Sequence, residues 1–146
     1  MFASHITHST GMPALDARDD FLRARRAQLA ARAARWLGRG RRRPNHPRTL
    51  PEPVSRPPRG AHREVIALRC IVGTVEPSPH FDERFRPASE HVRPRWERVA
   101  LAHRRGLALP PITVLQGPDG YYVVDGRHRV SVALASGRRE IEAWVR

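Results

Sequence analysis

The sequence contains no lysine. All 27 basic residues are arginine, and with 14 acidic residues they leave a formal charge of +13 over 146 residues. Alanine, proline and glycine are abundant, as a GC-rich coding bias would produce, so part of the charge reflects coding. A solvated, compositionally biased surface and an affinity for phosphate-bearing partners both explain such an excess, and composition leaves the two open.

Cysteine is nearly absent as well. The single Cys70 excludes an internal disulfide and a metal site built from paired thiols, so no structural metal is expected. No run of 18 apolar residues occurs, and the first twenty residues lack the basic-then-apolar order of a secretory signal. We therefore expect a cytoplasmic protein that is stabilised by packing and has no membrane as partner.

The basic charge is concentrated toward the N-terminus, where residues 1–60 hold 13 arginines and 4 acidic residues. Residues 1–13 are polar and predict a disordered start. Residues 14–38 predict a cationic amphipathic helix, with acidic residues early, arginines late and an apolar stripe at Leu15, Leu22, Leu29 and Trp36. The helix packs on the body through that stripe, contacts nucleic acid, or joins two chains as a homodimer; the sequence leaves these interpretations open.

Residues 39–62 are rich in proline and arginine and predict an extended, disordered linker. Four arginines in it, Arg39, Arg41, Arg42 and Arg43, form a patch able to meet phosphates without reading sequence, which suggests non-specific DNA affinity. A solvated charge run is the alternative.

Residues 63–146 predict the folded unit, a small α+β domain with a mixed sheet and few helices. Val65–Val72 is a β-rich run, a helix follows Pro94 and ends at Gly106, and Ile112–Leu115 with Tyr121–Val124 form a hairpin. A helix over Arg127–Ser136 and a last strand over Ile141–Val145 complete the pattern.

The segment that carries chemistry is YYVVDGRHRVSVALASG, residues 121–137, where a strand runs through Asp125 and Gly126 into a helix that opens with Arg127, His128 and Arg129. A helix start leaves N–H groups unpaired and carries partial positive charge, so cationic side chains are unfavourable there. A bound anion would compensate the repulsion between them and the helix dipole. We therefore predict a phosphate site at this junction.

Asp125 has several interpretations. It caps the helix, orients an arginine or histidine, or coordinates a magnesium ion that bridges phosphates. The competing view of the whole segment is that Asp125 caps the helix and pairs with Arg127 or Arg129 while His128 is merely exposed.

The order and spacing of these residues resemble the ParB/sulfiredoxin (ParB-like nuclease) superfamily. The matching segments are LPPITVL at 109–115, GYYVVDGRHRV at 120–130, and the positions Ala133, Gly137 and Ile141 to Ala143. The resemblance spans about residues 64–145. Small bacterial proteins similar to the ParB N-terminal domain come nearest, with Gly73-Thr-Val75 and Phe85-Arg-Pro87 matching and Arg127 standing in place of their first histidine.

That resemblance implies a ligand and further site residues. Members bind nucleotides, so Gly126, Arg127, His128 and Arg129 would hold the phosphates of CTP or ATP with Mg²⁺, and Arg86 and Ser89 would join them. Arg127 occupies the position of the sulfiredoxin nucleophilic cysteine, so sulfinic-acid repair is not expected. A phosphate- or nucleotide-binding module and a nucleotide-dependent phosphotransferase or hydrolase both remain open.

Overall fold

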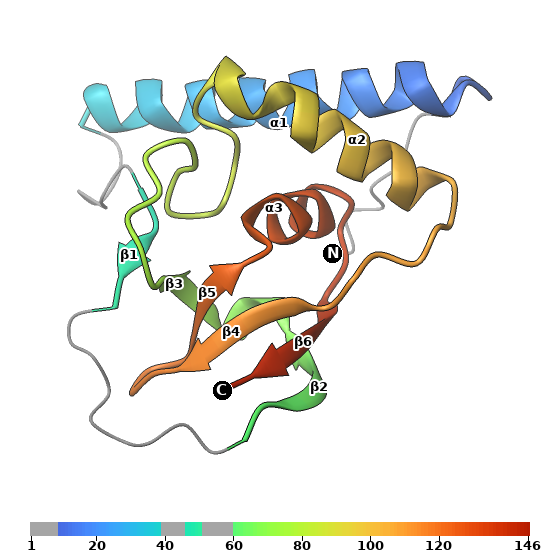
Figure 1. Cartoon of the computed structure of the whole chain (residues 1–146). Coiled ribbons are helices and arrows are strands. Elements are labelled where there is room, and N and C mark those ends of the chain that lie inside the picture. The colour runs from blue at the N-terminus through green and yellow to red at the C-terminus, as the bar shows by residue number, and fades with distance from the viewer. Residues whose placement is uncertain (1–8, 39–45, 51–59) are drawn as a thin grey trace, which may run out of the picture.

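The computed structural model describes residues 9–38, 46–50 and 60–146 and has an α+β fold, as the sequence predicts. Its elements in chain order are α1 (Pro13–Trp36), β1 (Arg48–Thr49), β2 (His62–Ala67), the 3₁₀ turn η1 (Leu68–Cys70), β3 (Ile71–Thr74), the 3₁₀ turn η2 (Glu90–Val92), α2 (Arg93–Arg104), β4 (Ile112–Gln116), β5 (Tyr121–Asp125), α3 (Arg127–Ala135) and β6 (Glu140–Val145). Figure 1 shows the sheet at the base, α3 above it, and α1 and α2 outermost.

The strands form one mixed sheet in the order β1-β3-β5-β4-β6-β2. The predicted hairpin is present, with β4 antiparallel to β5. Strand β6 lies parallel to β4 and antiparallel to β2, and β3 lies parallel to β5. The long crossover between β5 and β6 contains α3, which therefore covers one face of the sheet.

The apolar run Val65–Val72, expected as one strand, is divided between two. Its first part belongs to β2 at one edge of the sheet, and its last part belongs to β3 near the other edge. The three residues of η1 between them span at most about 14 Å, so the sheet must curl to bring these strands together. The run breaks because Leu68 turns into the interior, where it is 4% exposed.

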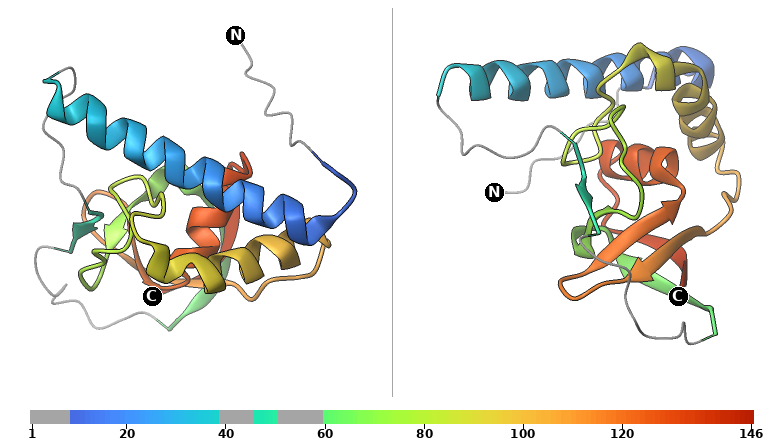
Figure 2. Two further views of the ribbon diagram at one scale, coloured as in Figure 1. Left: turned by 90° about the horizontal axis from the view of Figure 1, so that it is seen from above. Right: turned by 60° about the vertical axis from the view of Figure 1, so that its left-hand side comes forward.

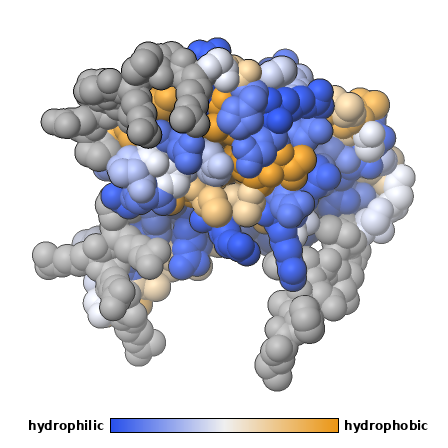
Figure 3. All heavy atoms as spheres, turned by 90° about the horizontal axis from the view of Figure 1, so that it is seen from below, coloured by the Kyte–Doolittle hydropathy of each residue, from blue (hydrophilic) through white to orange (hydrophobic). Residues whose placement is uncertain are grey.

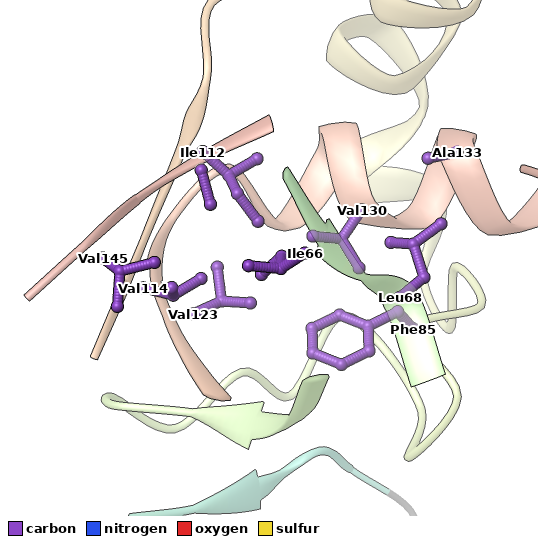
Figure 4. Close-up of a cluster of buried hydrophobic side chains, with 10 residues drawn as sticks. Ile66, Leu68, Phe85, Ile112, Val114, Val123, Val130, Ala133 and Val145 are labelled. Carbon is purple, nitrogen blue, oxygen red and sulfur yellow. The ribbon is translucent and has the colours of Figure 1, made fainter. Parts of the chain in front are cut away.

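The main core lies inside the curled sheet and beneath α3 (Figure 4). Ile112 and Val114 of β4, Val123 of β5 and Val130 of α3 are fully buried there. Ile112 and Val114 occupy alternate positions of β4, so both of their side chains face the core. This core fixes the junction between β5 and α3.

A second apolar cluster holds α1 and α2 on the body. Phe21 of α1 meets Trp96 of α2 edge to face, with ring centroids 5.6 Å apart, and both are fully buried. Trp96 also donates its Nε1–H to Ser131 Oγ of α3 at 2.8 Å. At the other end of the contact, Arg104 donates to both carboxylate oxygens of Asp20 at 2.6 and 2.8 Å. The helix is thus part of the folded unit (Figure 2).

The face of α1 that packs on the body is not the predicted one. The buried residues are Asp16, Ala17, Phe21 and Gln28, whereas Leu15, Leu29 and Trp36 are 43%, 46% and 90% exposed. The expectation of a buried seven-residue stripe is wrong for these three residues, because Phe21 supplies the anchoring ring, whereas Leu22 packs partly buried against the second apolar cluster. Asp16, although charged, is buried because Thr10 donates its N–H and hydroxyl to Asp16 Oδ1.

The expected linker also contributes to the sheet. Strand β1, Arg48–Thr49, pairs in parallel with β3, and Arg48 contacts Asp119 at 2.8 Å. The prediction that residues 39–62 form no regular structure is therefore wrong at these two residues and at His62, where β2 begins. The patch of Arg39, Arg41, Arg42 and Arg43 lies outside the described residues.

Within the described ranges, no helix has both the length and the apolar character needed to span a bilayer.

Candidate functional site

The predicted junction is built as a strand, one glycine and a helix. Strand β5 ends at Asp125, and Gly126 precedes α3 with φ of 107°. A Cβ on Gly126 would lie 2.5 Å from Ile112 Cγ2, so both the backbone conformation and the packing require glycine. This residue sets the direction in which α3 leaves the sheet.

The start of α3 has free donors. Gly126 provides no side chain to cap the helix, and the first intrahelical bond runs from Val130 N–H to Gly126 O. The N–H groups of Arg127, His128 and Arg129 have no protein acceptor within the part of the chain that the structure describes. Three backbone donors and the positive end of the helix dipole are therefore available to an anion.

These donors open into a pocket of about 530 Å³ between α3, α2 and the segment around Ser78–Phe81. Its charged lining consists of Arg95, Arg127, Arg129 and a single acid, Asp125. Its apolar lining includes Phe81, Val92, Val99 and Leu109. We call this the junction pocket; it offers cationic groups on one side and room for an organic group on the other.

The guanidinium group of Arg127 is only weakly engaged by the described residues. Its only ion pair in the described structure is a loose one, 3.7 Å to Glu76, whose side chain is 81% exposed. The Nε of Arg127 is buried without a partner among the described residues. An unsatisfied guanidinium nitrogen is costly, so an acceptor oxygen from a ligand would stabilise it.

Arg129, in contrast, has its guanidinium group held by hydrogen bonds within the protein. It donates to Pro110 O at 2.6 Å, to Pro111 O at 2.7 Å and to Asp125 Oδ2 at 2.8 Å, and its side chain is only 13% exposed. Asp125 therefore orients Arg129 and does not cap α3. The predicted pairing of Asp125 with Arg129 is present. Arg129 lines the pocket and adds positive charge to it, but these hydrogen bonds already occupy its donors.

His128 is uncharged at neutral pH. Burial, and then the charges of Arg95, Arg127 and Arg129, together lower the pKa of its imidazole from 6.5 to about 4, against the opposing effect of Asp125. Its ring meets Phe81 edge to face at 5.3 Å. A bound anion would oppose all three arginines and so raise the pKa of His128.

Sequence reasoning missed three lining residues. Arg95 of α2 reaches the pocket and has no ion pair or hydrogen bond within the described residues, and His80 and His91 stack on each other at 4.9 Å beside it. The available signal was the position of Arg95 one helical turn before Val99, on the face that borders α3. His80 and His91 lie in irregular chain and carry no such signal.

Two residues suggested by the resemblance are placed elsewhere. Arg86 donates through Nε to Asp82 Oδ2 at 2.7 Å and organises its own loop, and Ser89 accepts from His91 N–H at the start of η2. Neither lines the junction pocket. The structure thus brings together Asp125, Gly126, Arg127, His128 and Arg129 but not Arg86 or Ser89.

The described residues include no group of three or more His, Cys, Asp or Glu side chains arranged to hold a metal ion. Asp125, the residue considered for magnesium, has one carboxylate oxygen bonded to Arg129.

These features define a small α+β protein with a cationic pocket at a helix start. Among solved structures, the crystal structure of sulfiredoxin from Arabidopsis thaliana is similar in fold, at 21% identity and a TM-score of 0.39, over 58% of this chain and 84% of that chain. The chain matches no family model, and no curated protein matches its sequence. The function proposed below rests on the side chains of this chain.

Proposed function

We propose that this protein binds a phosphate-bearing small molecule in the junction pocket. The observation that carries the proposal is the set of three N–H groups at the start of α3 that have no acceptor among the described residues, in a pocket whose charged side chains are three arginines and one aspartate. A phosphate there would accept from the backbone and from Arg127, and Arg95 would approach it from α2.

Phosphate fits this pocket better than a simple carboxylate. It has more acceptor oxygens and a higher charge, so it can use backbone and guanidinium donors together. The apolar wall of Phe81, Val92 and Val99 suits the organic part of the ligand. The resemblance to a superfamily with nucleotide-binding members favours a nucleoside triphosphate, CTP or ATP, with Mg²⁺ carried on the phosphates.

His128 favours one alternative, a nucleotide-dependent phosphotransferase or hydrolase. Its imidazole is uncharged at neutral pH because of burial and the neighbouring arginines, and it lines the same pocket. A neutral imidazole beside a phosphate can accept a proton from an attacking hydroxyl or water, while the arginines neutralise charge on the phosphoryl oxygens. Product formation distinguishes this enzyme from a binding module.

Non-specific DNA affinity through Arg39, Arg41, Arg42 and Arg43 is a separate part of the proposal. If arginine–phosphate contacts drive it, the affinity should fall steeply with salt and should be lost when residues 39–43 are replaced by a neutral linker.

The test is calorimetric titration of inorganic phosphate, CTP and ATP, with and without Mg²⁺, into the wild type and into Arg127→Gln and Arg95→Gln. Losing a charge-assisted bond costs about 1.5–3 kcal/mol, so each variant should bind at least about tenfold more weakly. Arg98→Gln is the matched control, because Arg98 is an exposed arginine of α2 that does not line the pocket.

Equal losses of affinity in Arg95→Gln and Arg98→Gln would indicate non-specific attraction by the net positive charge and would contradict a specific binding site in the junction pocket. Absence of binding by any of the three anions at low salt would refute the proposal outright.

A further inference from the structure

Helix α1 carries exposed apolar side chains outside its buried face, whereas Leu22, between them in the chain, packs partly buried against the second apolar cluster. Met12, Leu15, Leu29, Trp36 and Leu37, here called the outer stripe, are 60%, 43%, 46%, 90% and 71% exposed. Figures 1 and 2 show α1 as the outermost layer, with no other described element over its far side. On the opposite face of the molecule, Figure 3 shows hydrophobic residues in small patches between hydrophilic ones.

This exposure is not the result of a loosely attached helix. The inward side of α1 is fixed by Phe21 against Trp96 and by the two-bond contact of Arg104 with Asp20. The outer stripe therefore stays outward while the protein is folded. A row of exposed apolar side chains on a fixed element is typical of an interaction surface.

Arginines accompany the outer stripe. Arg18 follows Leu15 by three residues, Arg26 precedes Leu29 by three, and Arg32 follows Leu29 by three, so each lies beside the stripe on the helix surface. All three are exposed, and none has an ion pair or hydrogen bond in the described part of the chain. The occupant of this surface must accept apolar side chains and supply negative charge next to them.

We propose that α1 docks on the surface of an anionic lipid bilayer. The leucines and Trp36 would enter the boundary between headgroups and acyl chains, and the arginines would extend to the lipid phosphates. Trp36 lies at the end of the 24-residue helix, where an indole can sit at headgroup level. The expectation of no membrane partner rested on the lack of an 18-residue apolar run and of a signal-like N-terminus, and these concern a membrane span or secretion rather than a helix lying at the bilayer surface.

Charge disfavours the other occupants. In a pair of α1 helices from two copies, parallel or antiparallel, Arg26 lies near the middle of the helix and would meet the partner's arginines, with Asp19 as the acidic residue beside the stripe. A nucleic-acid backbone satisfies the arginines but gives the leucines and Trp36 no apolar contact. An anionic bilayer satisfies both sets of side chains.

The test is binding of the full chain to phosphatidylcholine vesicles with and without phosphatidylglycerol. In a Trp144→Phe background the exposed indole is Trp36, because Trp96 is fully buried. We expect a blue shift of tryptophan emission with the anionic vesicles only. Leu29→Gln should weaken binding about tenfold and Arg26→Gln about fivefold.

Leu107→Gln is the matched control, because Leu107 is a 58% exposed leucine outside α1, and it should bind as the wild type does. Equal binding by Leu29→Gln and the wild type, no binding to anionic vesicles at low salt, or a dimer that Leu29→Gln dissociates would each overturn the proposal. So would DNA binding that depends on Leu29. All four variants leave the junction pocket intact, so this result is independent of phosphate binding.

Discussion

Replacing His128 by glutamine should remove part of the acid sensitivity of the fold. The folded-state pKa of His128 is about 4, below its ordinary value of 6.5, because the ring is partly buried and faces Arg95, Arg127 and Arg129, with only Asp125 opposing them. Between these two values the unfolded chain binds the proton and the folded chain does not. The free energy of unfolding therefore rises with pH through this window, and the contribution is lost as the pH falls from 6.5 toward 4.

The size of the effect follows from the shift. One pKa unit corresponds to about 1.4 kcal/mol, so full expression of the shift would be worth roughly 3 kcal/mol. The ring is partly open to solvent, which screens the arginines, so we expect roughly 1–2 kcal/mol. The acidic groups with lowered pKa values, Asp16 and Asp119, titrate below this window.

The assay is urea unfolding of the wild type and His128→Gln between pH 4.5 and 7.5. The wild type should lose stability toward low pH more steeply than the variant. His103, whose pKa burial also lowers, remains in both proteins and cancels in the comparison. His62→Gln, at an exposed position outside the pocket, is the control for the replacement of a histidine by glutamine. Identical slopes for His128→Gln and the wild type would show that the imidazole is not held uncharged, and the electrostatic description of the pocket would be wrong.

Three further predictions concern the elements that position the site. Gly126→Ala forces a side chain into the left-handed region and against Ile112, so it should destabilise the protein by about 2 kcal/mol or more in urea unfolding; a loss below about 0.5 kcal/mol would contradict the described backbone. Arg104→Gln removes the contact with Asp20 and should cost about 1–3 kcal/mol, with faster amide exchange in α1 than in β4; uniform exchange would place the loss elsewhere. Asp125→Asn weakens the hold on Arg129 and should reduce phosphate affinity less than Arg127→Gln does; a larger loss would make Asp125 the main determinant.

Local signals in the sequence were sufficient for the hairpin and for the junction between β5 and α3. The Pro-Asp-Gly turn and the alternation of β4 and β5 are short-range patterns, and Gly126 marks the helix start because its conformation excludes other residues. These features depend on neighbours in the chain, which is why the sequence predicts them.

The features that the sequence did not predict depend on contacts between distant residues. The face that α1 buries is chosen by Trp96, sixty or more residues away in the chain, and no periodicity within α1 shows that Phe21 is buried while Leu15, Leu29 and Trp36 are exposed. Arg95 likewise joins the pocket only because α2 packs on α3 through the Trp96–Ser131 hydrogen bond. Arg129 was expected to face a ligand, but the carbonyls of Pro110 and Pro111 engage its donors.

The place of β6 between β4 and β2 has a consequence for how the molecule is assembled. Strand β2 (residues 62–67) pairs in the sheet with β6 (residues 140–145). Almost the whole domain must therefore be synthesised before β2 has its hydrogen-bonding partner. During synthesis the hairpin of β4 and β5 can form early, whereas β2 must stay unpaired until β6 has been made. The intermediate that precedes β6 therefore exposes the edge that carries Val65 and Ile66.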